Sequence, residues 1–150
     1  MIPQKAKIQQ LQFVIMYSLV EIYVAEDATK VDLSQIPIDI DFDILQNLEE
    51  TPHLVRIVMT IKGNCEKAVS GYVFELKVGG EYKVSDELEV MGDNYKSLVQ
   101  GSAVACLINE VRVYLQTITS FYPFKSYIMP MIDMKDLWEK KSLSDKEAAE

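Results

Sequence analysis

Few side chains in this 150-residue sequence suit nucleophilic or acid–base chemistry, and they are widely spaced. The sequence has one histidine, His53, and two cysteines, Cys65 and Cys106. His53 follows a proline at the expected start of a strand, with no serine or cysteine nucleophile near it, so a catalytic triad is not indicated. Cys106 lies on the apolar face of an expected helix, where a free cysteine is usually buried. We therefore expect no catalytic residue, no cofactor and no enzymatic activity.

Three aspartates at alternate positions, Asp39, Asp41 and Asp43, could in principle bind a hard cation. In a strand, however, residues on one face lie roughly 7 Å apart along a line, and such a row does not wrap around an ion. A row of charges is a common protection of an edge strand against aggregation. We therefore expect a solvated sheet edge here and no metal site.

The segment after Pro123 suits a different chemistry, the binding of other polypeptides, because it is rich in aromatic residues and methionines. An unfolded chain offers backbone groups and scattered apolar side chains, which an adaptable apolar surface can bind without a shaped pocket. The candidates for such a surface are Phe124, Tyr127, Met129, Met131 and Trp138. The alternative is that the segment only covers a sheet, and this fits Met134 and Leu137 best because they have helical spacing.

Three segments show the alternation of apolar and polar residues that indicates half-buried strands. It is strictest over residues 36–44, and it recurs over residues 55–62 and 72–78. Gly63-Asn64 predicts the turn of a hairpin between the last two of these strands. Gly79-Gly80 lacks the residues of a phosphate-binding loop, so we expect it to form the turn that ends the last strand.

Residues 11–25 predict a further strand, although two lysines before an apolar run also imitate a signal peptide. Tyr23 is too large for the position before a cleavage site, and Glu21 closes the apolar run. Valine, isoleucine, leucine and aromatic residues occur on both faces of the segment, as in a long strand covered on each side.

A long helix is expected from about residue 101, because apolar residues recur there at spacings of four and three. Pro123 predicts its end near Phe121. A second apolar row widens the apolar surface to more than half the circumference, so the helix needs cover from its own sheet and from another subunit. The candidates for this oligomer interface are Val104, Ile108, Val111, Leu115 and Ile118.

Four strands followed by helices, with no crossover helix between strands, predict an α+β fold. We expect a four-stranded antiparallel sheet, a long helix packed on one face, and a short C-terminal helix with Asp133 as its N-cap. The chain should form one domain over residues 1–150, with residues 140–150 as a fraying helix or disordered tail. A hot-dog thioesterase would place its central helix before most of the strands, and the order here is the reverse.

The composition excludes several classes of partner. Lys and Arg number 15 against 23 Asp and Glu, a net charge of −8, which disfavours nucleic acids and anionic membranes. The uncharged runs are too short to span a bilayer. Two cysteines are too few for a disulfide framework, so the cytoplasm is the expected location.

The end of the long helix and the segment after it resemble the C-terminal part of the SecB protein-export chaperones. The family has a Phe-Pro or Tyr-Pro pair after the helix, and then a proline, a valine or isoleucine, Asn or Asp, a phenylalanine, two variable residues, a leucine and an aromatic residue. The matching residues are Tyr122, Pro123, Pro130, Ile132, Asp133, Met134, Leu137 and Trp138. The sequence has one extra residue after Pro130 and lacks the family's Pro-Tyr-Ala-Arg run in the helix, which marks a distant member.

This resemblance implies a tetramer built as a dimer of dimers, which holds unfolded polypeptides without ATP during protein export. It places the segment after Pro123 along the client groove. It also implies docking of the motor SecA on carboxylates of the outer sheet face, where Glu75 and Glu21 match. Lys77 on the same face weakens the negative field there, so ordinary solvated surface is the alternative.

Two other functions remain open. One is a SecB-like chaperone dedicated to a single client, such as an antitoxin. The other is a structural or adaptor subunit that has no chaperone activity and whose apolar helix only holds an assembly together.

Overall fold

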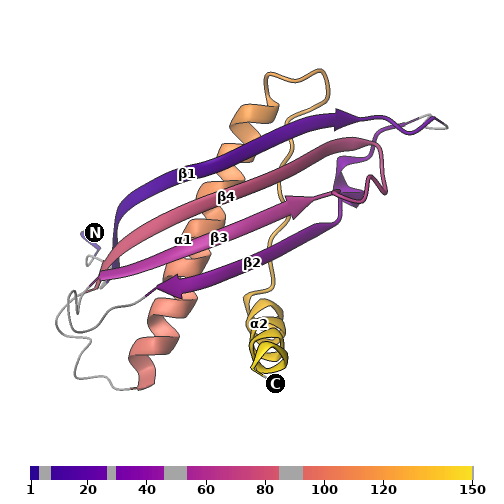
Figure 1. The fold of residues 1–150 in the computed structure, drawn as a ribbon. Helices are drawn as coiled ribbons and strands as arrows, with labels where there is room; N and C mark the ends of the chain where they lie inside the picture. Colours follow the sequence, from indigo (N-terminus) through magenta and orange to yellow (C-terminus); the bar gives the residue numbers. More distant parts are fainter. Residues whose placement is uncertain (4–7, 27–29, 46–53, 85–92, 150) are drawn as a thin grey trace.

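The computed structural model describes residues 1–3, 8–26, 30–45, 54–84 and 93–149. The elements in chain order are β1 (Ile8–Tyr23), the 3-10 turn η1 (Leu33–Gln35), β2 (Ile38–Leu45), β3 (Leu54–Gly63), β4 (Gly71–Val84), α1 (Asp93–Thr119) and α2 (Met134–Ala148). The strands form one antiparallel sheet in the order β1-β4-β3-β2. Helix α1 crosses one face of this sheet obliquely (Figure 1). The predicted α+β fold is thus confirmed.

The core lies between α1 and the inner face of the two central strands. The alternating apolar rows that the sequence predicts for β3 and β4 are buried, with at most 1% of any side chain exposed. These rows are Val55, Ile57, Met59 and Ile61 in β3, and Tyr72, Phe74, Leu76 and Val78 in β4. Burial of one such side chain stabilises the fold by about 1.5–3 kcal/mol, so this layer accounts for the position of α1.

The turn expected at Gly79-Gly80 is wrong, because both glycines lie inside β4, which continues to Val84. They pair with β1 on one side and with β3 on the other. A Cβ atom on Gly79 would lie 2.9 Å from Met16 Cε and 3.1 Å from Val14 Cγ2. Glycine occurs here because the side chains of Met16 and Val14 pass close to the strand and leave no room for a Cβ atom.

The long helix begins earlier than the apolar pattern predicted, at Asp93, and ends at Thr119, close to the expected end. The segment that imitates a signal peptide lies within β1 and pairs with β4. The expectation that β1 is covered on each side is not met within this chain, because β1 is an edge strand whose apolar side chains remain partly exposed.

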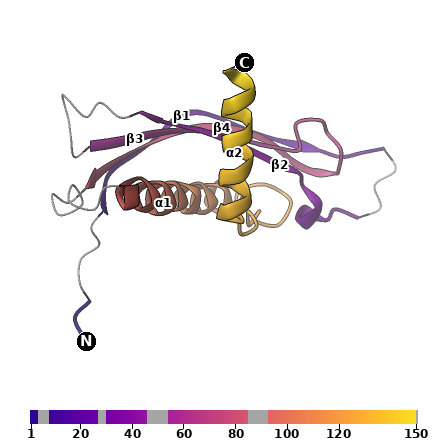
Figure 2. The ribbon, with the colours of Figure 1, turned by 90° about the horizontal axis from the view of Figure 1, so that it is seen from below.

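Helix α2 lies beside the other edge strand, β2, and passes through the level of the sheet, whereas α1 lies along one face (Figure 2). Its predicted N-cap is confirmed: Asp133 Oδ1 accepts hydrogen bonds from the amides of Lys135, at 2.9 Å, and Asp136, at 3.2 Å. Residues 140–148, expected as a fraying helix or a disordered tail, are its last turns.

Gly63 provides a test of the packing between β3 and β4. A Cβ atom there would lie 2.1 Å from Cζ of the buried Phe74 ring, so we expect Gly63→Ala to lower the free energy of unfolding by about 1–3 kcal/mol. Gly101→Ala is the matched control, because a Cβ atom at this exposed position of α1 meets nothing within 4 Å. It should raise the stability by about 0.5–1 kcal/mol. Urea denaturation measures both effects, and equal stability of the two variants would contradict the packing described.

Candidate functional site

The segment between α1 and α2 is fixed by hydrogen bonds at three alternate residues. Tyr72 Oη donates to the carbonyl of Lys125 at 3.0 Å, and the amide of Tyr127 donates to Thr119 Oγ1 at 2.8 Å. Arg112 Nε donates to the carbonyl of Met129 at 2.9 Å. Because the backbone is held at every second residue, the segment has a defined inner and outer side.

The inner side of this segment belongs to the core. Tyr127 and Met129 are buried, and the Tyr127 ring packs against Phe74 with centroids 5.4 Å apart. Burial raises the pKa of Tyr127 to about 12. Tyr127 and Met129, two of the five expected client-binding residues, are therefore part of the core. A ligand could contact them only at the floor of a groove.

The other three candidates differ in exposure. Met131 is 80% exposed. Phe124 is half-buried and packs edge-on against Tyr72, with centroids 5.7 Å apart. Trp138 is half-buried and packs edge-on against Phe42 of β2, at 4.9 Å.

A groove of about 570 Å³ lies between this segment and the residues that precede β2. Val31, Asp32, Leu33 and Ser34 line one side, and residues 123–128 line the other. Ile128, 62% exposed, is the most accessible apolar side chain among those that line it. Neither Ile128 nor residues 31–34 are among the binding residues expected from the sequence, because no local pattern shows that these two segments, about ninety residues apart, lie side by side.

Comparison with known proteins addresses the fold. No protein-family model matches the sequence, and no curated protein matches it. Among solved structures, the chain is similar to the Mycobacterium tuberculosis SecB-like chaperone Rv1957 in complex with a ChAD peptide from the Rv1956 HigA1 antitoxin. The TM-score is 0.53 at 8% sequence identity, over 84% of this chain and 91% of that chain. The chain has the SecB-like fold.

A Streptococcus agalactiae protein of unknown function is also similar, with a TM-score of 0.45 and 10% identity over 83% of this chain and 97% of that chain. The resemblance to SecB drawn from residues 122–138 is confirmed at the level of the fold.

Within this SecB-like fold, most of the expected oligomer interface faces the chain's own sheet. Val104, Ile108, Val111 and Leu115 are buried in the core, with at most 4% of any side chain exposed, and Ile118 is half-buried. The core of this chain thus uses the side chains of Val104, Ile108, Val111 and Leu115, and an oligomer interface through α1 stays a prediction. From residue 101 onward, the exposed side of α1 is mainly uncharged and polar, with Asn109, Gln116 and Thr117 around an exposed Val113.

Among the residues whose side chains the structure describes, a long run of exposed apolar side chains lies along the edge strand β1. It includes Val14, 37% exposed, and six residues that are each 38–49% exposed: Leu11, Ile15, Met16, Tyr17, Leu19 and Ile22. The register of β1 against β4 shifts between Ile15 and Tyr17, so a bulge lies in the middle of this edge. We call these six residues the β1 strip.

The two carboxylates matched to SecA docking lie on β1 and β4. The register places Glu21 opposite Val73 and Glu75 opposite Leu19. Glu75 also lies 3.8 Å from Lys62 Nζ, and six residues further along the same two strands Arg56 Nε lies 2.7 Å from Glu81. These cations reduce the negative field of the face, and SecA docking stays a prediction.

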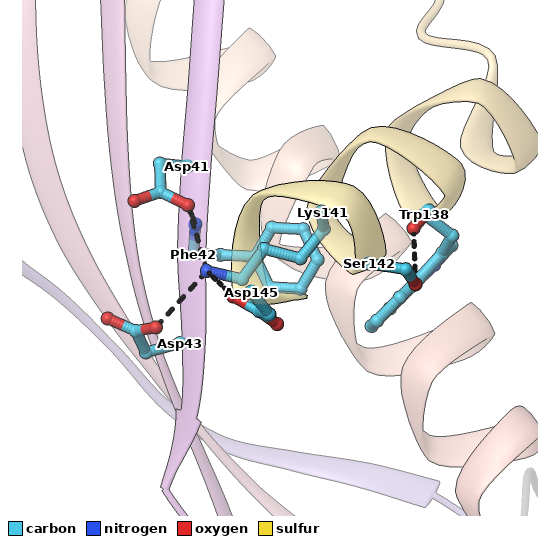
Figure 3. A network of polar contacts seen from close by, with 7 residues as sticks. All are labelled: Asp41, Phe42, Asp43, Trp138, Lys141, Ser142 and Asp145. Carbon is cyan, nitrogen blue, oxygen red and sulfur yellow. Dashed lines mark hydrogen bonds and ion pairs between the residues drawn. The ribbon is translucent and has the colours of Figure 1, made fainter. Parts of the chain in front are cut away.

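The aspartate row lies on β2, which is an edge strand as expected. In the part of the chain that the structure describes, no group of three His, Cys, Asp or Glu residues could hold a metal ion. The side chains of Asp41 and Asp43 instead contact Lys141 of α2 (Figure 3).

Two other expectations concern catalysis and membranes. His53 lies outside the described residues. Among the described residues, no helix is long and apolar enough to cross a membrane.

Thr119 tests how the segment after α1 is anchored. Thr119→Val keeps the side-chain shape but leaves the buried amide of Tyr127 without its acceptor, which should cost about 1–3 kcal/mol of stability. Thr117→Val is the control, because the exposed Thr117 hydroxyl bonds only to the Val113 carbonyl within α1. Hydrogen exchange of the Tyr127 amide should accelerate only in the Thr119 variant. Unchanged protection of this amide would show that the segment is held in another way.

Proposed function

We propose that this protein is an ATP-independent chaperone that binds unfolded polypeptide segments in the groove between residues 31–34 and 123–128. The observation that carries the proposal is the position of this groove beside the apolar segment after Pro123. Hydrogen bonds with Arg112 and Thr119 of α1 fix the backbone of this segment, so that its outer side stays exposed. The Mycobacterium tuberculosis chaperone of the same fold was solved with a bound antitoxin peptide, which supports binding of polypeptides by this fold.

The composition of the groove suits clients of varied sequence. Apart from Asp32 and Lys125, its lining is uncharged, and Leu33, Phe124 and Ile128 offer apolar contacts. Each apolar contact of this kind contributes about 1 kcal/mol, so a single groove would bind weakly. Tight holding would require several grooves in one oligomer to engage the same chain. The proposed activity is binding alone, without chemistry on the client.

Ile128→Asp should test the groove. An apolar segment that binds here would have to remove water from the new carboxylate, which costs free energy. We therefore expect the variant to suppress the aggregation of a reduced, unfolded model protein at least several-fold less well than the parent does. Light scattering measures this aggregation. Leu143→Asp is the matched control, because Leu143 is 60% exposed and lies on α2, outside the groove. Equal suppression by both variants and the parent would contradict the proposed site.

The identity of the client separates two forms of this proposal. A general role in export would place the protein in the cytoplasm with SecA as a partner, and Glu75→Lys should then weaken SecA binding without affecting client holding. A chaperone dedicated to one antitoxin is the second candidate, favoured by the peptide bound to Rv1957. If the protein neither suppresses the aggregation of unfolded proteins nor binds an antitoxin peptide, that result would favour the adaptor subunit over both chaperone functions.

We further propose that two copies associate through the β1 strip, with antiparallel pairing of the two β1 edges. No charged residue occurs from Ile8 to Val20, and the apolar side chains of this free edge are partly exposed. An edge without charges is open to strand addition. Pairing of β1 with β1 would be isologous and would close after two copies, and a dimer of dimers would then need a second interface.

The double substitution Met16→Lys and Tyr17→Lys should prevent this association, because it places two cations in the middle of the edge. We expect the mass measured by light scattering to fall to that of the 17.1 kDa protomer. Leu45→Lys is the control, since Leu45 is 54% exposed but lies on β2 at the opposite edge. An unchanged mass in the double variant would place the interface elsewhere.

A further inference from the structure

The side chain of Met131 lies on the surface against the guanidinium group of Arg112. It is 80% exposed, although Tyr127 and Met129, at the two preceding alternate positions, are buried. Arg112 Nη1 lies 3.2 Å from Met131 Sδ, and Nε of the same group donates to the Met129 carbonyl at 2.9 Å. The Met131 thioether is therefore open to solvent and is held beside a cation.

Exposure and contacts distinguish Met131 from the other methionines that the structure describes. Met59 and Met129 are enclosed by the core, with 0% of either side chain exposed, and Met16 on β1 is 48% exposed. Among the described methionines, only Met131 has a sulfur that accepts a hydrogen bond from another side chain. Since oxidation of methionine requires access to the sulfur, an oxidant can reach Met131 while Met59 and Met129 stay protected.

Oxidation would change what Met131 offers to Arg112. A thioether sulfur is only a weak hydrogen-bond acceptor. With hydrogen peroxide, a lone pair of Sδ attacks one peroxide oxygen, an S–O bond forms as the O–O bond breaks, and the other oxygen leaves as water. The sulfur loses two electrons and the peroxide gains them. The product, methionine sulfoxide, is polar, and its oxygen accepts hydrogen bonds.

We propose that Met131 is a site of reversible oxidation by peroxides, and that Arg112 binds the oxygen of its sulfoxide. The high exposure of Met131 leaves the side chain free to rotate and bring this oxygen to Nη1. Hydrogen bonds from a cationic donor to oxygen are roughly twice as strong as bonds between neutral groups. Methionine sulfoxide reductases would restore the thioether.

The oxidised side chain would reinforce an existing anchor. Arg112 uses Nε for the Met129 carbonyl and Nη1 for Met131, so the two bonds do not compete for one donor. Oxidation of Met131 therefore tightens the attachment of this segment to α1. The site lies outside the groove, which residues 123–128 line, and does not depend on the proposed chaperone function.

Limited treatment with hydrogen peroxide tests the site. Peptide mapping by mass spectrometry should find an added oxygen on Met131, with Met59 and Met129 unmodified. Exchange of the Arg112 Nε–H with water, followed by NMR, should slow by about threefold or more, because a stronger second bond holds the guanidinium group. Met131→Gln supplies a side-chain oxygen without an oxidant and should slow this exchange in the same way.

Met131→Leu is the matched control, because it keeps an apolar side chain but has no sulfur. Peroxide should still oxidise Met16 and the exposed Cys65 in this variant, yet leave the exchange of the Arg112 Nε–H unchanged. The proposal is refuted if Met131 stays reduced while Met16 is oxidised. It is also refuted if the Arg112 Nε–H exchanges as fast in the oxidised parent protein as in the untreated one.

Discussion

The packing of α1 against the inner face of β3 and β4 is the interaction on which the other surfaces of this molecule depend. It fixes Arg112 and Thr119, whose side chains hold the backbone of the segment that follows. Because Tyr127 and Met129 are drawn into the same core, Ile128 between them must face outward. The exposed apolar side of the groove is thus a consequence of how the core is filled, and it persists only while the core does.

The two edges of the sheet are protected in different ways. Edge strand β2 carries aspartates and is covered by α2, two common defences against unwanted strand pairing. Edge strand β1 has neither defence in the described residues, and it carries no charged residue from Ile8 to Val20. In the proposed function, this asymmetry leaves the β1 edge for a second copy, while α2 covers the β2 edge.

The sequence located the candidate site only approximately. The segment after Pro123 does border the groove, but two of the residues chosen from its composition, Tyr127 and Met129, are buried. Composition alone cannot separate the two sides of an irregular segment, because the alternation there is set by hydrogen bonds to Arg112 and Thr119 rather than by a regular repeat. Tertiary contacts decided which apolar residues face solvent.

The sequence by itself determined the fold class, the inward rows of β3 and β4, the apolar stripe of α1 and the Asp133 cap, because each depends on spacing within one element. The tertiary structure alone decided that Gly79-Gly80 lies within a strand, that residues 31–34 complete the groove and that Lys141 reaches β2. These features depend on contacts between segments far apart in the chain. A local pattern shows which face of an element is buried, but it does not show which distant segment lies against that face.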